Sequence, residues 1–160
     1  MTLLSPEFKF IRDVIRYVLS DYWPGTHWNP SGMFLNRDSD SPFTPVMQEI
    51  IKDILEDHAL DLHMCYDAYF PDKNITSKQH YKLCKEKSEK MMEDNYEDIL
   101  YKFIVVCAFL SLFTALSVVY GVDDAPIITH RVILRQFESL KNANVITDTF
   151  WDDLQSASYG

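Results

Sequence analysis

Glycine is scarce in this chain, which has only four glycines among its 160 residues. Tight turns between strands depend on glycine, so a fold with many β-strands is disfavoured. The three cysteines, Cys65, Cys84 and Cys107, are odd in number and far apart. We therefore expect no disulfide framework and a reducing, intracellular setting. Charged residues at Glu7 and Lys9 interrupt the start of the chain, so we expect no secretory signal.

Positive charge is also in short supply. The chain has 15 lysines and arginines against 24 aspartates and glutamates, which gives a formal net charge of -9. An acidic domain repels phosphate backbones and anionic lipid headgroups, so we expect no nucleic-acid partner. A basic peptide, in contrast, would be attracted to such a surface.

Motifs that carry catalysis are missing from the sequence as well. It contains no Gly-rich phosphate loop, nucleophile elbow or metalloprotease motif. His58, His63 and Cys65 are close in sequence, but zinc requires four ligands in structural sites. Helical spacing also places His58 and His63 about 140° apart around a helix. We therefore predict no enzymatic activity, no metal site and no cofactor.

Apolar residues are abundant, at 47% of the chain, with 14% aromatic. That content is enough to offset the conformational entropy lost on folding, so global disorder is excluded. A chain of this length suits one domain with one core, and we predict a single domain over residues 1–160.

Helical periodicity recurs along the chain. Apolar residues at helical spacing predict a first helix over residues 6–22, with Ser5 as its N-cap. Residues 23–45 are rich in proline and glycine and predict a loop that is mobile in part. A second amphipathic helix is predicted over residues 45–64. Thr76 or Ser77 then begins a polar helix.

The remaining elements are also predicted to be helical. We expect a short separate helix around residues 89–92 and a long one ending at Gly121, which suits a helix C-terminus. A helix with a proline near its first position follows over residues 125–140. A last short helix begins after Thr147 or Asp148. The sequence therefore predicts seven or eight helices.

The long helix contains no charged residue from position 103 to position 120. Such a segment is just long enough to span a bilayer, and it is equally suited to a helix buried on every side. Ser111, Thr114 and Ser117 dilute its apolar character, and no basic cluster flanks it. Amphipathic helices on both sides also require something to pack against. We therefore favour a buried central helix and expect no integral membrane segment.

Two segments in the first half of the chain resemble homology motifs of the Bcl-2 family. Residues 15–20 read Ile-Arg-Tyr-Val-Leu-Ser, which is similar to the family's N-terminal motif Tyr-Ile-x-Tyr-Lys-Leu-Ser. Residues 51–57 read Ile-Lys-Asp-Ile-Leu-Glu-Asp and resemble the homology 3 segment. Leu55 stands where that segment has a small residue, which makes this helix a poor ligand for another groove.

Two more segments resemble motifs of the second half of the family's fold. Residues 95–99, Asn-Tyr-Glu-Asp-Ile, resemble the Asn-Trp-Gly-Arg motif that opens the central helix, although Glu97 and Asp98 depart from it. Residues 148–150, Asp-Thr-Phe, resemble the Trp-Asp-Thr-Phe motif, with Thr147 in place of tryptophan. No single segment is specific, but the order, spacing and helical context of the four together span nearly the whole chain.

The resemblance implies an all-α, Bcl-2-like bundle of seven or eight helices around a central apolar helix. In this family a hydrophobic groove between the second to fifth helices receives a partner's amphipathic helix. Pro-survival members sequester pro-apoptotic Bcl-2 family proteins through their homology 3 helices and so inhibit apoptosis. The resemblance implies that function and those partners for this chain, with narrow ligand selectivity.

The groove residues that this resemblance implies follow from the predicted helix positions. Methionine is useful in such a lining because it repacks around different ligands. We expect about half of the apolar candidates to be plain core, because a helix stripe does not distinguish groove from core. The candidates are Met47, Ile51, Ile54, Leu55, Tyr81, Cys84, Met91, Met92, Asn95, Tyr96, Asp98, Ile99, Lys102 and Phe103.

Asp98 carries the sharpest prediction. The family has an arginine here, and it pairs with an aspartate of the partner helix. An aspartate would instead repel that partner carboxylate, by about 1 kcal/mol in a half-buried site. Lys102 lies four residues after Asp98. We consider two roles for it, an ion pair with Asp98 and a contact with the ligand. A plain alternative is that Asp98 is a solvated residue in the first helical turn.

Further expectations concern the setting of the protein. Family members usually carry a C-terminal membrane tail, and we expect none here, as in the Bcl-2 homologues of large DNA viruses. The expected location is the cytoplasm, with association to host mitochondria as one alternative. Homodimerisation through the groove is a further hypothesis. Some viral proteins of this fold bind innate-immune signalling adaptors instead of killer helices, and this is the second function that we consider.

Overall fold

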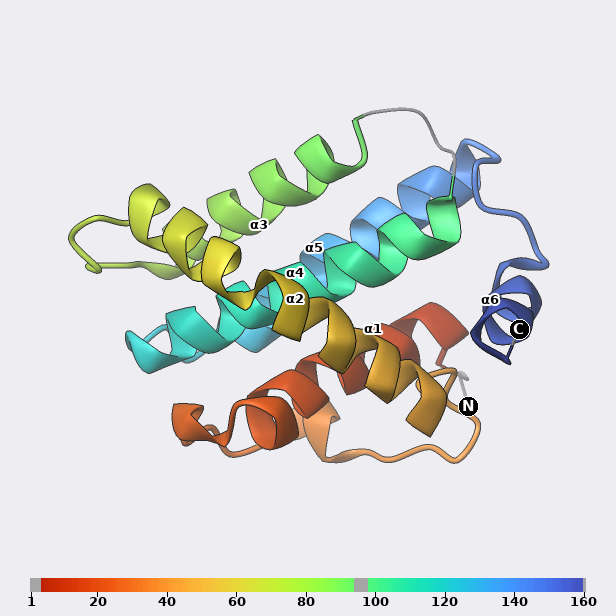
Figure 1. The fold of residues 1–160 in the computed structure, drawn as a ribbon, viewed down its shortest axis with the longest axis horizontal. Helices are drawn as coiled ribbons and strands as arrows, with labels where there is room; N and C mark the ends of the chain where they lie inside the picture. Colours follow the sequence, from red (N-terminus) through yellow and green to blue (C-terminus); the bar gives the residue numbers. More distant parts are fainter. Residues whose placement is uncertain (1–3, 94–97, 160) are drawn as a thin grey trace.

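The computed structural model describes residues 4–93 and 98–159, and these residues are mainly helical, with no strand among them. Short 3-10 turns, η2 and η3, lie between the first two α-helices, and a π-helical turn, η1, extends the first one. The all-α class is confirmed (Figure 1). The elements are α1 (Pro6–Tyr17), η1 (Val18–Tyr22), η2 (Pro24–Thr26), η3 (Gly32–Leu35), α2 (Pro45–Tyr69), α3 (Ser77–Met91), α4 (Ile99–Val119), α5 (Ala125–Asn142) and α6 (Phe150–Tyr159).

The helices begin where capping residues satisfy the first free backbone N–H groups. The Ser5 hydroxyl accepts a hydrogen bond from the Phe8 amide at 3.2 Å. Thr44 does the same at the start of α2. Thr76 forms a full capping box with Gln79, since each side chain accepts from the other residue's amide. The predicted helix starts are therefore confirmed and have a local cause.

Two predicted boundaries were wrong. The second helix continues to Tyr69, five residues beyond the predicted end. The predicted separate helix at residues 89–92 is the last turn of α3, where the Met92 amide still donates to the Ser88 carbonyl at 3.1 Å. No glycine or proline interrupts α3, so nothing breaks it earlier. Six α-helices therefore occur in the described part of the chain, where we expected seven or eight.

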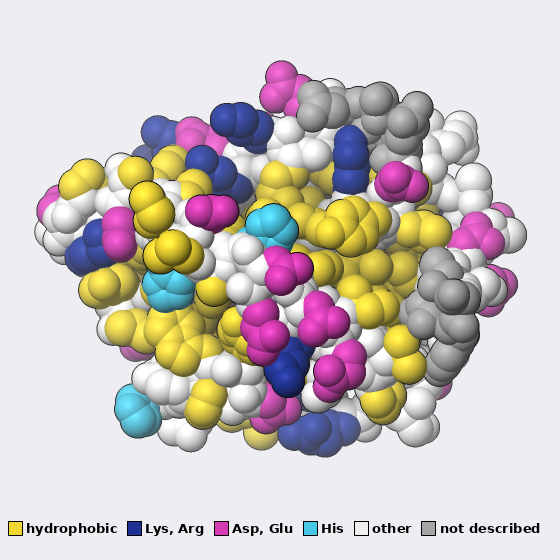
Figure 2. All heavy atoms as spheres, viewed as in Figure 1, with side chains coloured by type: hydrophobic (Ala, Val, Ile, Leu, Met, Phe, Trp, Pro, Cys, Tyr) yellow, Lys and Arg dark blue, Asp and Glu magenta, His cyan; other side chains and the backbone are white. Residues whose placement is uncertain are grey.

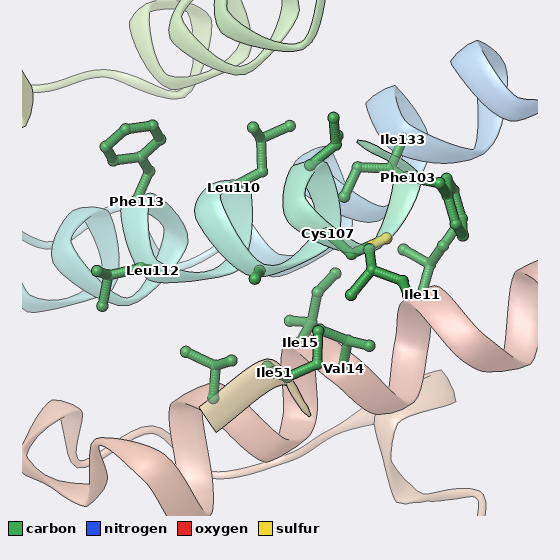
Figure 3. Packing of buried hydrophobic residues seen from close by; sticks show 14 of the residues in the cluster. Ile11, Val14, Ile15, Ile51, Phe103, Cys107, Leu110, Leu112, Phe113 and Ile133 are labelled. Atoms are coloured by element: carbon green, nitrogen blue, oxygen red, sulfur yellow. The ribbon is translucent and has the colours of Figure 1, made fainter. Parts of the chain in front are cut away.

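The apolar helix α4 lies at the centre of the bundle. It packs against α1, α2, α3 and α5, and 13 of its 21 residues are buried. Cys107 of α4 meets Ile11 and Ile15 of α1 on one side, whereas Leu110 and Phe113 extend toward α3 (Figure 3). By length and composition α4 also qualifies as a candidate membrane span. Its burial within the fold is what the core-helix alternative predicts.

Gly121 ends α4 in the way the sequence predicts. Its φ of 93° lies in the left-handed region that glycine adopts without strain. The Gly121 amide donates to the Val118 carbonyl at 3.0 Å, and the Val122 amide donates to the Ser117 carbonyl at 2.9 Å. This pair of bonds is the Schellman arrangement. It turns the chain sharply into α5, which starts at Ala125.

The segment between α1 and α2, predicted as a loop, is anchored to α1 by buried charges. The Arg16 guanidinium donates to the Phe34 and Asn36 carbonyls at 2.9 and 2.5 Å. The fully buried Arg12 pairs with Asp38 at 3.0 Å. The side chain of Phe34 is itself buried. These contacts fix the path along which the chain enters α2.

The arrangement of α2 and α3 shapes the surface above α4. Both helices pack on α4 but make little direct contact with each other. They lie close together near the turn that joins them, and they diverge away from it toward the N-terminal end of α4 (Figure 1). Near the turn, the Tyr69 hydroxyl donates to a Glu86 carboxylate oxygen at 2.7 Å. The divergence leaves one side of α4 without a covering helix over its N-terminal half.

Candidate functional site

An apolar strip lies in the angle between α2 and α3. Figure 2 shows hydrophobic side chains gathered there on the surface, with acidic side chains along the α2 border. The floor is the uncovered side of α4, where Val105 and Phe109 are half-buried. Further along the same side, Leu112 and Leu116 are buried. The strip therefore ends where α2 and α3 converge.

Contacts of α2 define which of its flanks borders the strip. The His58 ring meets the Phe109 ring edge-on at 5.3 Å. Ile50 and Ile54 lie eight and four residues before His58 and share its flank. The opposite flank faces η1 and η2, since the His63 ring lies 5.4 Å from the Trp23 ring.

Contacts of α3 define its strip flank in the same way. The Lys87 ammonium lies over the Tyr69 ring of α2, 5.8 Å from its centroid. The half-buried Met91, four residues on, shares that flank. The opposite flank of α3 faces α5. We define the apolar strip as Ile50, His58, Met91, Ile99, Val105 and Phe109.

Seven of the predicted groove residues belong to the core. None of them exposes more than 7% of its surface, so none offers a ligand more than an edge. Ile51, for example, lies between α1 and α4 (Figure 3). Core residues thus make up somewhat more than the expected half of the apolar candidates. The seven are Met47, Ile51, Ile54, Leu55, Cys84, Met92 and Phe103.

The other predicted site residues divide between several places. Met91, Ile99 and Lys102 are half-buried, and the first two belong to the strip. Tyr81 is exposed and faces α5. Asn95 and Tyr96 lie outside the described residues.

Asp98 is an exposed residue directly before α4. Its φ of 54° is left-handed, a conformation that aspartate tolerates better than most residues. Its side chain makes no capping hydrogen bond, although it occupies the N-cap position. Its carbonyl accepts a hydrogen bond from the Lys102 amide at 2.9 Å.

Sequence reasoning missed Val105, Phe109, His58 and Ile50. A signal existed for the two on α4, because they follow Asp98 at intervals of seven and eleven residues. It was hidden because every residue around them is also apolar, so no polar face marks the uncovered side. Nothing in the sequence reports the angle between α2 and α3, which decides what is covered.

The two helices that border the strip carry opposite charge. Six carboxylates and one lysine occur on α2. Five lysines and two glutamates occur on α3. Among them, Asp61 lies three residues after His58 and four after Asp57. On α3, Lys87 lies four residues before Met91 and three before Lys90, so each set follows one side of its helix. The strip is therefore bordered by an acidic helix on one side and a basic helix on the other.

A separate cavity of about 580 Å³ lies on the other side of α3, against α5. Met92, Val132 and Leu140 supply apolar lining, and Lys85 and Arg135 supply positive charge. The Gln136 amide crosses from α5 to α3 and donates to the Ser88 carbonyl at 3.0 Å. This cavity does not belong to the apolar strip.

Under the convergent end of α2 and α3, polar side chains meet inside the core. His80 of α3 contacts Ser117 of α4 through Nδ1 and Thr129 of α5 through Nε2, both at 2.8 Å. The Tyr66 hydroxyl of α2 lies 2.9 Å from the Ser117 hydroxyl. Thr114 contacts Thr129. We call these five residues the polar cluster, and they join four helices.

One arrangement of hydrogens satisfies every bond of the polar cluster. Thr114 donates to the Leu110 carbonyl at 2.7 Å, so it must accept from Thr129. Thr129 must then accept from His80, which places the proton on Nε2. Nδ1 is left to accept from Ser117. Tyr66 in turn donates to Ser117.

Burial sets the protonation states in the polar cluster. Burial raises the pKa of Tyr66 to about 12, which keeps its hydroxyl protonated as a donor. Burial lowers the pKa of His80 to about 4. The ring is therefore neutral near pH 7, as the bonding pattern requires.

The histidines that were weighed as metal ligands lie apart. His58 contacts α4 and His63 contacts Trp23, as their spacing on one helix predicts. Within residues 4–93 and 98–159, no three His, Cys, Asp or Glu side chains gather as a metal site.

Comparisons of this chain with protein-family models, curated protein sequences and solved structures find no match. The resemblance to the Bcl-2 family therefore stays a prediction that rests on the four sequence segments. Most of the third segment, residues 95–99, lies outside the described residues.

Proposed function

We propose that this protein binds an amphipathic helix of a partner protein on the apolar strip. The observation that carries the proposal is the divergence of α2 and α3, which leaves Val105 and Phe109 of the central helix half-exposed. A surface strip of apolar side chains on a folded domain marks an interaction site. Its position between two helices suits a third helix, laid with its apolar face against α4.

The resemblance to the Bcl-2 family supplies the partner in this proposal. Partners are pro-apoptotic proteins, bound through their homology 3 helices, and the protein acts as an inhibitor of apoptosis. Such helices carry an aspartate that the family's arginine binds. With Asp98 in place of that arginine, Lys87 and Lys90 of α3 are cations that border the strip. The partner's aspartate would pair with these lysines.

The experiment is a calorimetric titration of the protein with a panel of homology 3 peptides from killer proteins. Val105→Glu, which adds a charge to the strip, should weaken binding at least tenfold because the carboxylate must be desolvated. Ile127→Glu is the matched control, since Ile127 is an exposed apolar residue of α5. Circular dichroism of both variants checks that the fold is retained. Equal affinity of the two variants would contradict the proposed surface.

A second candidate function keeps the fold and changes the partner. The cavity between α3 and α5 is separate from the strip and offers a different recognition surface. That observation favours binding of an innate-immune signalling adaptor, the alternative drawn from the resemblance. Failure of every homology 3 peptide, with a monomer in sedimentation, would support it. A dimer in sedimentation would instead indicate that a second copy covers the strip.

A further inference from the structure

We propose that the apolar strip selects a helix whose two flanks carry opposite charge, basic toward α2 and acidic toward α3. This inference rests on the proposed function, because it describes the ligand of the same surface. The occupant is an amphipathic helix from another protein. Charge complementarity with the two bordering helices identifies its chemistry.

The acidic border comes from residues on one flank of α2. Asp57 and Asp61 are exposed and lie one turn apart, next to His58, whose ring touches the floor of the strip. Neither residue has an ion pair among the described side chains. Their charge is therefore free to act on a ligand.

Other carboxylates of α2 point elsewhere. Glu49 and Glu56 act electrostatically on Tyr17, and Glu56 also acts on Tyr22, so both glutamates lie toward α1 and η1. Helical spacing agrees, because Glu56 is separated from Asp61 by about 140° around the axis. One helix thus offers two pairs of carboxylates, one beside the strip and one away from it.

The basic border comes from Lys87 and Lys90 of α3. Lys87 is held over the ring of Tyr69, where α2 and α3 converge. Lys90 follows one turn later, toward the wider end of the strip. The neighbouring Lys85 faces α5 instead and belongs to the other side of the helix.

Opposite charge on the two borders creates a field across the strip. A helix lying there with a basic flank toward α2 and an acidic flank toward α3 gains from both borders. Turning the helix end for end exchanges its flanks, so the attraction at each border becomes a repulsion. The borders thus specify which flank pattern and which direction fit, in addition to the apolar anchors. Because the charged groups are exposed, salt weakens the effect.

Three synthetic helices with one apolar face test the inference in anisotropy titrations at low salt. The polarised peptide has lysines on one flank and glutamates on the other. The interleaved peptide has the same composition, with both charges mixed on each flank. The uncharged peptide has glutamine on both flanks. We expect the polarised peptide to bind about 3- to 10-fold more tightly than the interleaved one. The difference should be lost in about 0.5 M salt.

Variants of the protein locate the effect. Asp57→Asn with Asp61→Asn should remove most of the advantage of the polarised peptide. Glu49→Gln with Glu56→Gln changes the net charge equally on the same helix and should leave the advantage intact. Equal effects of the two double variants would overturn the inference, because peptide affinity would then depend only on the net charge of the protein.

The outcomes separate this inference from the proposed function. If the uncharged and interleaved peptides bind as tightly as the polarised one, the charge selection is wrong and the helix-binding surface stands. If none of the three peptides binds, and Val105→Glu changes nothing in the panel of homology 3 peptides, the surface itself is wrong.

Discussion

The two halves of α4 are both mainly apolar but have different surroundings. Around the C-terminal half, α2 and α3 converge, and Ser117 and Thr114 join the polar cluster with His80. Around the N-terminal half the same two helices diverge, and Val105 and Phe109 are half-exposed. Composition alone therefore does not decide which part of an apolar helix is core. The angle between its neighbours does.

The comparison also separates stability from binding. Buried polar groups whose hydrogen bonds are all satisfied fix a single arrangement of the helices that carry them. The polar cluster does this where α2, α3, α4 and α5 meet. No such bonds join α2 and α3 across the strip among the described residues, and Val105 and Phe109 stay half-buried there. The polar cluster fixes the angle between α2 and α3 where they converge, and that angle keeps the two helices apart over the N-terminal half of α4.

The largest effect is expected from breaking the polar cluster. His80→Ala leaves the hydroxyls of Ser117 and Thr129 without their partner and creates a cavity, so it should lower the free energy of unfolding by about 3 to 5 kcal/mol. Val105→Ala on the strip should cost about 1 kcal/mol, because that side chain is only half-buried. Urea denaturation measures both. Similar losses for the two variants would contradict the division between the halves of α4.

Acid should weaken the polar cluster, which packs around the C-terminal half of α4. Burial lowers the pKa of His80 to about 4, against about 6.5 in the unfolded chain. The unfolded chain therefore binds the proton first, so stability is full above pH 6.5 and falls as the pH drops toward 4. The loss from this residue is about 3 kcal/mol.

His130 adds to the acid effect, since burial lowers its pKa too. Urea denaturation at a series of pH values should show the slope, and His80→Asn should reduce it without abolishing it. Val105→Ala, a substitution on the strip that removes no titratable group, is the control and should leave the slope unchanged. An unchanged slope in the His80 variant would show that the ring does not stay neutral in the fold.

The smallest effects are expected at the ends of α4. Gly121→Ala places a side chain at a φ of 93° and should destabilise the fold by about 1 kcal/mol. Asp98 has a φ of 54°, so Asp98→Gly should be more stable than Asp98→Ala by about 1 kcal/mol. Thermal unfolding of the three variants provides the measurement. A more stable Asp98→Ala than Asp98→Gly would show that the left-handed turn is absent in solution.

Removal of the Asp98 charge is also a test of the strip. Asp98→Asn keeps a side chain that tolerates the left-handed backbone, so any change in peptide affinity reports the charge. Asp98→Arg restores the family's residue and should tighten or broaden binding of homology 3 peptides. No change in affinity across the panel would show that Asp98 is only a solvated residue before α4.

Local features of the fold, such as helix ends, were predictable from the sequence, whereas the angles between helices were not. Ser5, Thr76 and Gly121 mark helix ends because each satisfies backbone groups of its own helix. The polar cluster joins Tyr66 to Ser117 across 51 residues and His80 to Ser117 across 37. No spacing in the sequence encodes such contacts. The serine and threonines of α4 were interpreted only as a dilution of its apolar character.

The candidate site shows the same limit. An apolar stripe identifies which side of α2 faces inward, and its residues Met47, Ile51 and Leu55 are indeed buried. Whether an inward residue meets a neighbouring helix or a groove depends on where that neighbour lies. For this reason the strip residues Met91 and Ile99 were predicted, whereas Val105 and Phe109 were missed.

The sharp turn at Gly121 also bears on the order in which the protein assembles. It joins α4 and α5 with few intervening residues, so the entropy lost in closing that helix pair is small. Local helix pairs of this kind form quickly. The contact of α2 with α4 must instead close a chain segment that includes all of α3. We expect the α4–α5 pair to form early on the folding pathway and the strip to take its shape late.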